Sequence, residues 1–264
     1  MDYDLRFFAS GPTELPPVAA KAGFRSGAKG THTSRTMMLD DLVAVLATVP
    51  ADAPRAGYTQ AIIESNCLGK TTIATRRHSN QRLGELYAFD TQVPLFRVLR
   101  RIWDLDQAGR PLLALQCAVA RDPLLAATAT AILSLPAGAE FQRDQMRQAL
   151  RSAVGDRLND AILDKVMRNA ASSWTQSGHL EGRTFKKRRL VQPTPGSLAY
   201  ALYLGNLAGF RGLQLFSSGW ITLLDCSLSC AQDLAFEAKK LGLLDLRISG
   251  DIVELKFDRL DRQG

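Results

Sequence analysis

The chain has 264 residues and is 46% hydrophobic, which suffices for ordinary globular packing in about two domains or three small modules. Its formal net charge of +7 favours an acidic partner such as nucleic acid. Aromatic residues make up only 7%, which gives little support to a stacking platform for single strands. The four scattered cysteines indicate reduced thiols in a cytoplasmic protein.

The first 34 residues are expected to form an irregular N-terminal arm. Their opening, "MDYDLRFFASGP", is acidic before a short apolar patch, which is not typical of a signal peptide. Residues 11–34 are rich in Pro, Gly, Ser and Thr, a composition typical of a loop that wraps around a folded body.

Residues 35–92 predict a helix-turn-helix module. Apolar residues at helical spacing follow Thr36, which could cap a first helix, and Pro50 and Pro54 end it. A second helix is expected over 56–65 and a third from Thr71 or Thr72 to about Phe89. The connection "NCLGK" contains a glycine, as such a turn often does.

The sequence "LGKTT" resembles the end of a phosphate-binding P-loop, but Glu64 stands where that motif needs glycine. A helix N-terminus that holds a nucleic-acid phosphate is the preferred interpretation. An ordinary helix with solvated arginines is the alternative. The expected nucleic-acid-binding residues of this module are Lys70, Thr71, Thr72, Thr75, Arg76, Arg77, Ser79 and Asn80.

Residues 93–140 predict a compact helical core, in which prolines open several helices. Two uncharged stretches, 123–139 and 190–210, could be mistaken for membrane spans. Each is interrupted by prolines or is too short to cross a bilayer, which takes about 20 apolar residues. We therefore expect core helices and no membrane association.

Residues 141–194 predict a winged-helix module. Two amphipathic helices, the second capped by Asn159, precede a segment in which Gly178 and Gly182 bracket a plausible hairpin. The hairpin would be a basic wing that contacts phosphates without specifying sequence. A disordered basic loop and a targeting-like patch are the alternatives. The expected wing residues are Arg183, Lys186, Lys187, Arg188 and Arg189.

Residues 195–264 predict a winged-helix-like module without the basic charge. Three helices are followed by alternating apolar and polar residues on either side of "SGD", which is typical of a β-hairpin. Residues 225–264 carry a net charge of −2, so we expect this module to mediate packing or partner contacts.

Positive charge is concentrated in two islands. Residues 70–101 carry 7 positive and 2 negative charges, and residues 141–190 carry 11 and 5, while the rest of the chain is net negative. Such clustering is expected for phosphate contacts more than for general solubility.

No catalytic or metal-binding constellation is visible. His179 is expected to be a turn histidine that bonds its own hairpin, while His32 and His78 have no partner that the sequence identifies. Cys226 and Cys230 lack the further ligands of a zinc site and are expected in the core, and the tryptophans are expected to pack there. We expect a non-enzymatic protein without cofactors.

Three segments, "ESNCLGKTTIATRRHSNQRLGELY", "LLALQCAVARDPLL" and "RNAASSWTQSGHLEGRTFKKR", resemble the BrxA family. These are accessory proteins of bacterial BREX (bacteriophage exclusion) defence operons, often labelled domains of unknown function or putative inner membrane proteins. The resemblance covers most of the chain from about residue 35.

The resemblance implies a mainly α, cytosolic protein with winged-helix elements and a core likened to the antitermination factor NusB. It also implies nucleic-acid binding in phage defence, with other defence proteins as partners. The family's helix-turn-helix would fall on Lys70–Asn80 and its wing on Arg183–Arg189.

The combined expectation is a non-enzymatic protein that binds double-stranded DNA with weak sequence preference. Two alternatives stay open: an RNA-binding factor of the antitermination kind, and a protein-interaction scaffold within a defence complex. A hydrolase that uses His179 is a third, remote possibility.

Overall fold

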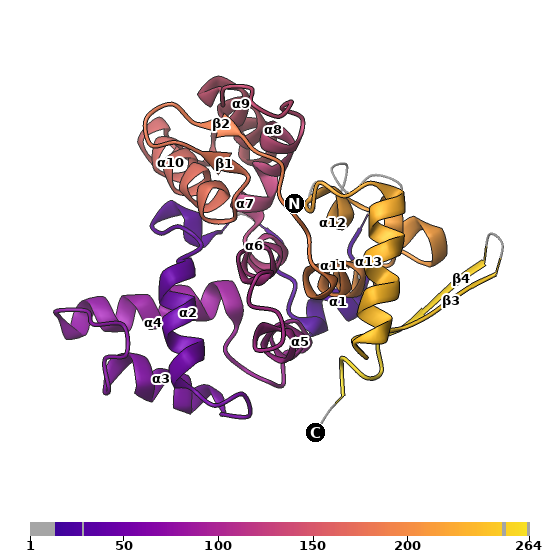
Figure 1. Cartoon of the computed structure of the whole chain (residues 1–264). Helices are drawn as coiled ribbons and strands as arrows, with labels where there is room; N and C mark the ends of the chain where they lie inside the picture. The colour runs from indigo at the N-terminus through magenta and orange to yellow at the C-terminus, as the bar shows by residue number, and fades with distance from the viewer. Residues whose placement is uncertain (1–13, 28, 250–251, 263–264) are drawn as a thin grey trace.

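The computed structural model describes residues 14–27, 29–249 and 252–262, and it shows a mainly helical protein with two small antiparallel hairpins, as the sequence predicts. Three groups of helices surround a central helix, α6 (Figure 1). The expectations for residues 1–13 and for the Gly250–Asp251 hairpin tip lie outside the described residues.

The described part of the N-terminal arm is not wholly irregular, which corrects the expectation for residues 1–34. It contains helix α1 (Pro17–Ala22) and the 3-10 helix η1 (Thr31–Thr33). A proline suits the first turn of a helix, and Gly23, with φ of 109°, ends α1 in the left-handed conformation. The prolines and glycines that suggested a loop are thus the ends of a short helix.

Three helices lie within residues 35–92, close to the predicted ranges. Thr72 caps the third, since its Oγ1 accepts a hydrogen bond from the Thr75 amide at 3.2 Å. Thr36 is not the cap of the first, because that helix begins after Met38 and the Thr36 hydroxyl accepts from the Met38 amide instead. The helices are α2 (Leu39–Thr48), α3 (Arg55–Ile63) and α4 (Ile73–Tyr87).

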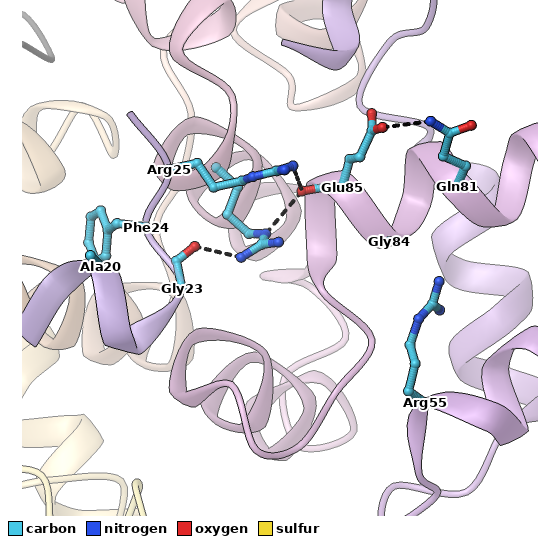
Figure 2. Close-up of a pocket in the computed structure, with 9 residues that line it drawn as sticks. Ala20, Gly23, Phe24, Arg25, Arg55, Gln81, Gly84 and Glu85 are labelled. Carbon is cyan, nitrogen blue, oxygen red and sulfur yellow. Dashed lines mark hydrogen bonds between the residues drawn. The ribbon is translucent and has the colours of Figure 1, made fainter. Parts of the chain in front are cut away.

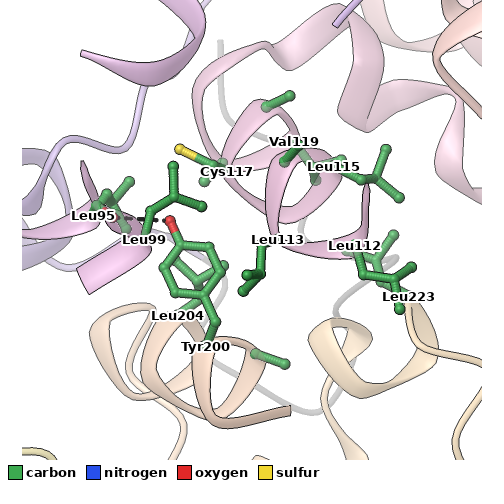
Figure 3. Packing of buried hydrophobic residues seen from close by; sticks show 14 of the residues in the cluster. Leu95, Leu99, Leu112, Leu113, Leu115, Cys117, Val119, Tyr200, Leu204 and Leu223 are labelled. Carbon is green, nitrogen blue, oxygen red and sulfur yellow. Dashed lines mark hydrogen bonds between the residues drawn. The ribbon is translucent and has the colours of Figure 1, made fainter. Parts of the chain in front are cut away.

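The centre of the molecule is α6, whose residues 112–120 are all buried. It packs against α4, α5 and α11, which belong to three different parts of the chain. Figure 3 shows leucines of α5, α6 and α11 meeting there, with the Tyr200 hydroxyl donating to the Leu95 carbonyl at 3.1 Å. The core helices are α5 (Pro94–Trp103), α6 (Arg110–Arg121), α7 (Pro123–Ala127) and α8 (Ala129–Leu133).

The next group is a helix pair followed by a short hairpin. Asn159 caps the second helix, as predicted, by accepting from the Ile162 amide. Strand pairing in the hairpin places Leu180 opposite Arg188 and Glu181 opposite Lys187. The elements are α9 (Arg143–Val154), the 3-10 helix η2 (Gly155–Arg157), α10 (Asp160–Gln176), β1 (Leu180–Glu181) and β2 (Lys187–Arg188).

The last group wraps α11, which is buried on nearly every side because its sequence is uncharged throughout. Thr194 and Ser197 form a reciprocal capping box at its start. The elements are α11 (Pro195–Leu207), η3 (Gly212–Ser217), α12 (Gly219–Thr222), α13 (Leu228–Lys240), β3 (Asp245–Ser249) and β4 (Ile252–Lys256).

Two expectations about apolar segments can be compared with the structure. By length and composition, no single helix among the described residues could cross a membrane, and the pair Arg110–Arg121 and Pro123–Leu133 meets the criterion only together, with a bend of 102°. The tryptophans at positions 103, 174 and 220 are all buried, as predicted.

A buried polar junction holds three parts of the chain together at the bend between α6 and α7. Asp122 Oδ2 accepts from the His32 amide at 3.0 Å and lies 2.8 Å from His32 Nδ1, while Oδ1 accepts from two amides at the start of α7. His32 Nε2 lies 2.8 Å from Ser173 Oγ on α10. Burial alone would raise the pKa of Asp122, but the contacts with His32 outweigh it and hold the pKa below its usual value.

Replacement of Asp122 by Ala should lower the free energy of unfolding by about 3–5 kcal/mol, because it leaves three buried amides and the Nδ1 of the buried His32 without their partner. Urea denaturation would measure the loss. The matched control is Asp233→Ala on the exposed side of α13, expected within about 0.5 kcal/mol of the parent. Equal stability of the two variants would contradict the junction's role.

Candidate nucleic-acid interface

The cations of the first basic island, residues 70–101, are largely bonded within the protein. Six of its seven cations bond to carboxylates or to backbone carbonyls, so the charge seen in the sequence does not become a charged surface. The exception within the described chain is the exposed Arg77. The engaged cations are Lys70, Arg76, Arg82, Arg97, Arg100 and Arg101.

Lys70 and Arg76, two of the expected binding residues, fix the turn between α3 and α4. Lys70 Nζ lies 2.7 Å from Asp41 Oδ1. Arg76 donates from Nε to the Lys70 carbonyl and from Nη1 to the Ile63 carbonyl, both at 3.2 Å. Since Ile63 ends α3, this arginine satisfies a carbonyl that the helix leaves without a partner.

The expected binding face of α4 is turned partly inward. Ser79 is buried and therefore cannot contact nucleic acid, which corrects the sequence-based expectation. Thr75 and Asn80 are half-buried, and the exposed ones among the expected binding residues are Thr71 and Thr72 at the helix start and Arg77. The face of α4 that solvent reaches carries Ala74, Arg77, His78 and Gln81.

The hairpin predicted as a basic wing exists, and a third segment pairs with it. Glu140 bridges to Lys187, the Phe141 amide donates to the Lys186 carbonyl at 2.8 Å, and the Arg188 amide donates to the Ala139 carbonyl at 2.8 Å. The hairpin therefore lies against the entry to α9 and does not stand alone.

Arg188 is not a wing contact, which is a second correction. It is only 2% exposed, and its guanidinium forms an ion pair with Asp225 and donates to the Arg189 carbonyl. Asp225 also accepts from the Val191 amide at 2.9 Å. This buried pair attaches the hairpin to the C-terminal module.

The remaining wing cations differ in how freely they could reach a phosphate. Lys186 Nζ donates to Thr175 Oγ1 at 2.8 Å and to the Gly182 carbonyl at 3.1 Å, and burial lowers its pKa. Arg189 lies 3.4 Å from Glu181 on the surface. Arg183 and Lys187 are exposed and have no partner among the described residues.

The outer face of α10 adds cations that the sequence analysis did not single out. Lys165 and Arg168 are exposed and without partners in the described chain. The arginines of α9 are different, because Arg147 and Arg151 lie 2.7 and 2.5 Å from the α10 carboxylates. Lys165 and Arg168 occur at helical spacing opposite the buried stripe of α10, a signal that was available in the sequence.

A groove of about 480 Å³ separates α10 from the wing. Its cations are Arg143, Arg168, Arg183 and Lys186, and they outnumber its two carboxylates. Phe185, which is 73% exposed, stands at its edge. We call this surface, formed by Lys165, Arg168, Arg183, Phe185 and Lys187, the wing–α10 surface.

Among the described residues, no group of three or more His, Cys, Asp or Glu side chains could hold a metal ion. The His179 ring does not bond its own hairpin as expected: Nδ1 lies 2.9 Å from Ser177 Oγ at the end of α10, and Nε2 lies 2.9 Å from the Leu223 carbonyl. The Ser173–His32–Asp122 chain resembles a hydrolase triad in connectivity, but all three side chains are fully buried. Cys226 and Cys230 are half-buried and so do not lie in the core as expected.

No protein-family model matches the chain, and no curated protein matches it.

Replacement of Arg188 by Ala should destabilise the protein by about 3–5 kcal/mol, because Asp225 would keep a buried charge without its partner. Lys187→Ala, one residue away and exposed, should change stability by less than about 0.5 kcal/mol. Chemical denaturation of both variants checks this, and a larger loss in Lys187→Ala would refute the assignment.

Acid should destabilise the fold through His179. Burial lowers the pKa of His179 from its ordinary 6.5 to about 4. Between these values the unfolded chain binds the proton and the folded chain does not. The unfolding free energy should therefore fall as the pH drops from 6.5 to 4, by up to about 3 kcal/mol.

The comparison is between the parent and His179→Gln, each denatured across this pH range. As the pH falls, the unfolding free energy of the parent should decrease more than that of His179→Gln. His78→Gln, at an exposed position, is the control and should follow the parent. Parallel parent and His179→Gln curves would contradict the prediction.

Proposed function

We propose that this chain is a non-enzymatic accessory protein that binds double-stranded DNA through the wing–α10 surface. The observation that carries the proposal is that the exposed Arg168 and Arg183 line one groove between α10 and the hairpin without partners in the described chain, while most other arginines of the basic islands are bonded internally. Lys165 on α10 and Lys187 on β2 add two more exposed cations to the same two elements. These cations need negatively charged partners, and a phosphate backbone carries negative charge at regular spacing.

The order of elements supports a winged helix-turn-helix here. Helix α8, the bridging segment at residues 139–141, α9, α10 and the β1–β2 hairpin follow one another, with the hairpin beside α10 (Figure 1). In winged helices the helix before the hairpin enters the major groove. We assign that role to α10, with Lys165 and Arg168 on its outer face.

Weak sequence preference is part of the proposal. The free side chains are cations, which position a protein on the backbone without reading bases. Phe185 adds an exposed aromatic ring that could pack against a sugar or wedge beside a base step. Lys186 and Arg189 lie close by and could change partners on binding.

We also propose a second contact with DNA through α4, which would be the weaker of the two. Arg77 and the exposed Thr71 and Thr72 at the helix start could reach a phosphate. Lys70 and Arg76 would have to exchange internal bonds for it.

The biological assignment rests on the resemblance to the BrxA family. We propose a cytoplasmic protein of a BREX phage-defence system, with a NusB-like core and other defence proteins as partners. RNA binding through the same surface is the nearest alternative, since a basic winged helix can also contact an RNA backbone.

The scaffold alternative has one observation in its favour. The C-terminal module exposes several large apolar side chains. On the surface of a monomeric protein, such side chains are usually fewer and farther apart. They are Leu228, Phe236, Leu241 and Ile252.

Fluorescence anisotropy of labelled duplex DNA across a salt series tests the proposal. Contacts to about four phosphates should give a log–log slope near −4. The double variant Arg168→Ala/Arg183→Ala should weaken binding and make the slope shallower by about 2. Lys240→Ala/Arg247→Ala, which removes two exposed cations from the C-terminal module, is the matched control and should bind as the parent does.

Three outcomes would overturn the proposal. Tighter binding of RNA of equal length would favour the RNA alternative. Equal losses in the two double variants would show that only net charge matters. No salt-dependent binding at low ionic strength would favour the scaffold.

A further inference from the structure

A second cationic site lies away from the wing, in a cavity of about 410 Å³ between the end of α1, the start of α3 and the ends of α4 and α6. Three arginines from separate parts of the chain line it: Arg25 after α1, Arg55 at the start of α3 and Arg121 at the end of α6. Figure 2 labels Arg25 and Arg55. Its volume is within the range of small-molecule sites, about 300–1,000 Å³. We call it the three-arginine cavity.

Two of these guanidinium groups converge on one backbone atom. Arg25 Nη1 donates to the Glu85 carbonyl at 3.3 Å, and Arg121 Nε donates to the same oxygen at 3.1 Å. Arg121 also donates to the Gly23 carbonyl at 2.5 Å. These carbonyls lie at helix ends, where they lack intrahelical partners, so Arg121 has a structural role. A carbonyl does not neutralise two cations, however, and each guanidinium has five N–H donors.

The guanidinium of Arg55 makes even weaker hydrogen bonds. Its Nη1 is buried with no hydrogen-bond partner, and Nη2 makes only a long bond of 3.5 Å to the Asn80 carbonyl. Space for the guanidinium depends on Gly84, since a Cβ there would lie 2.7 Å from Nη2. The cation lies 5.6 Å from the centre of the Phe89 ring. A buried charged donor without a partner is costly and indicates a missing acceptor.

The carboxylate beside the cavity does not supply that acceptor. The Glu85 side chain already accepts from Thr31 Oγ1 at 2.9 Å, Arg82 Nη1 at 2.8 Å and Gln81 Nε2 at 3.0 Å. Figure 2 shows it turned toward Gln81 and away from Arg55. Asp90 acts on Arg55 electrostatically but forms no ion pair with it. Burial lowers the pKa of Arg55 and of Arg121, so their surroundings disfavour the charge that both carry.

We propose that the three-arginine cavity binds a small phosphorylated molecule, whose phosphate oxygens accept from the uncommitted N–H groups of Arg25, Arg55 and Arg121. A guanidinium fork matches phosphate geometry and binds it through two parallel hydrogen bonds. Arg25 and Gln81 are exposed, so the cavity can be reached from solvent. This site shares no side chain with the wing–α10 surface and stands independently of DNA binding.

Isothermal titration calorimetry of the full chain with pyrophosphate, AMP and citrate at constant ionic strength tests the proposal. Pyrophosphate or AMP should bind, and citrate should bind more weakly. Arg55→Gln and Arg25→Gln should each weaken binding by about tenfold or more, since each removes charge-assisted hydrogen bonds. Arg247→Gln, an exposed arginine of β3, is the control and should stay within about twofold of the parent.

Arg121 is left intact in these variants because it caps two helix ends. The exposed Arg25 gives a variant whose folding should be unaffected, and unfolding midpoints without ligand verify this for both. Absence of phosphate binding, unchanged affinity in both variants, or a preference for citrate would each overturn the proposal. So would preferential binding of an oligonucleotide with a 5′-phosphate over AMP, which would assign the cavity to a nucleic-acid end.

Discussion

The carboxylate of Asp122 is buried at the bend between α6 and α7, and its need for donors fixes the positions of distant segments. It holds His32 of the N-terminal segment, which in turn bonds Ser173 of α10. Ser173 Oγ also accepts from the Met37 amide, and the Met37 carbonyl accepts from the Tyr87 hydroxyl at the end of α4. A single buried charge thus helps to place the N-terminal segment, the α9–α10 pair and the α2–α4 group relative to the core.

Several arginines of this fold satisfy backbone carbonyls. Arg76, Arg100 and Arg121 donate to carbonyls at helix ends, and Arg101 donates to carbonyls of the C-terminal turn; several of these bonds join segments far apart in sequence. A basic island in the sequence is therefore a poor guide to a basic surface. The cations that matter for a phosphate partner are those that the fold leaves without acceptors, and four of these, Lys165, Arg168, Arg183 and Lys187, lie on or beside α10.

The helices could be predicted because their ends are encoded locally: Thr72, Asn159 and Thr194 cap, and prolines open first turns. Ser79 was misassigned although the pattern was visible, since it continues the inward stripe of Leu83 and Leu86 by one turn. Arg188 could not have been placed, because its partner is 37 residues away and depends on how two modules dock. The three-arginine cavity was equally beyond prediction, as it joins residues from three separate elements.

The N-terminal segment from Gly23 to Met37 connects the two candidate sites. Its Gly23 carbonyl and Arg25 form one wall of the three-arginine cavity, and its Thr31 binds Glu85 beside that cavity. The next two residues, His32 and Thr33, lie at the junction with α10. Asn169 of α10 donates to the His32 carbonyl at 2.8 Å. Displacement of this segment would expose the Asp122 carboxylate and release α10 at the same time. Both sites therefore depend on the position of this short segment, although no side chain belongs to both.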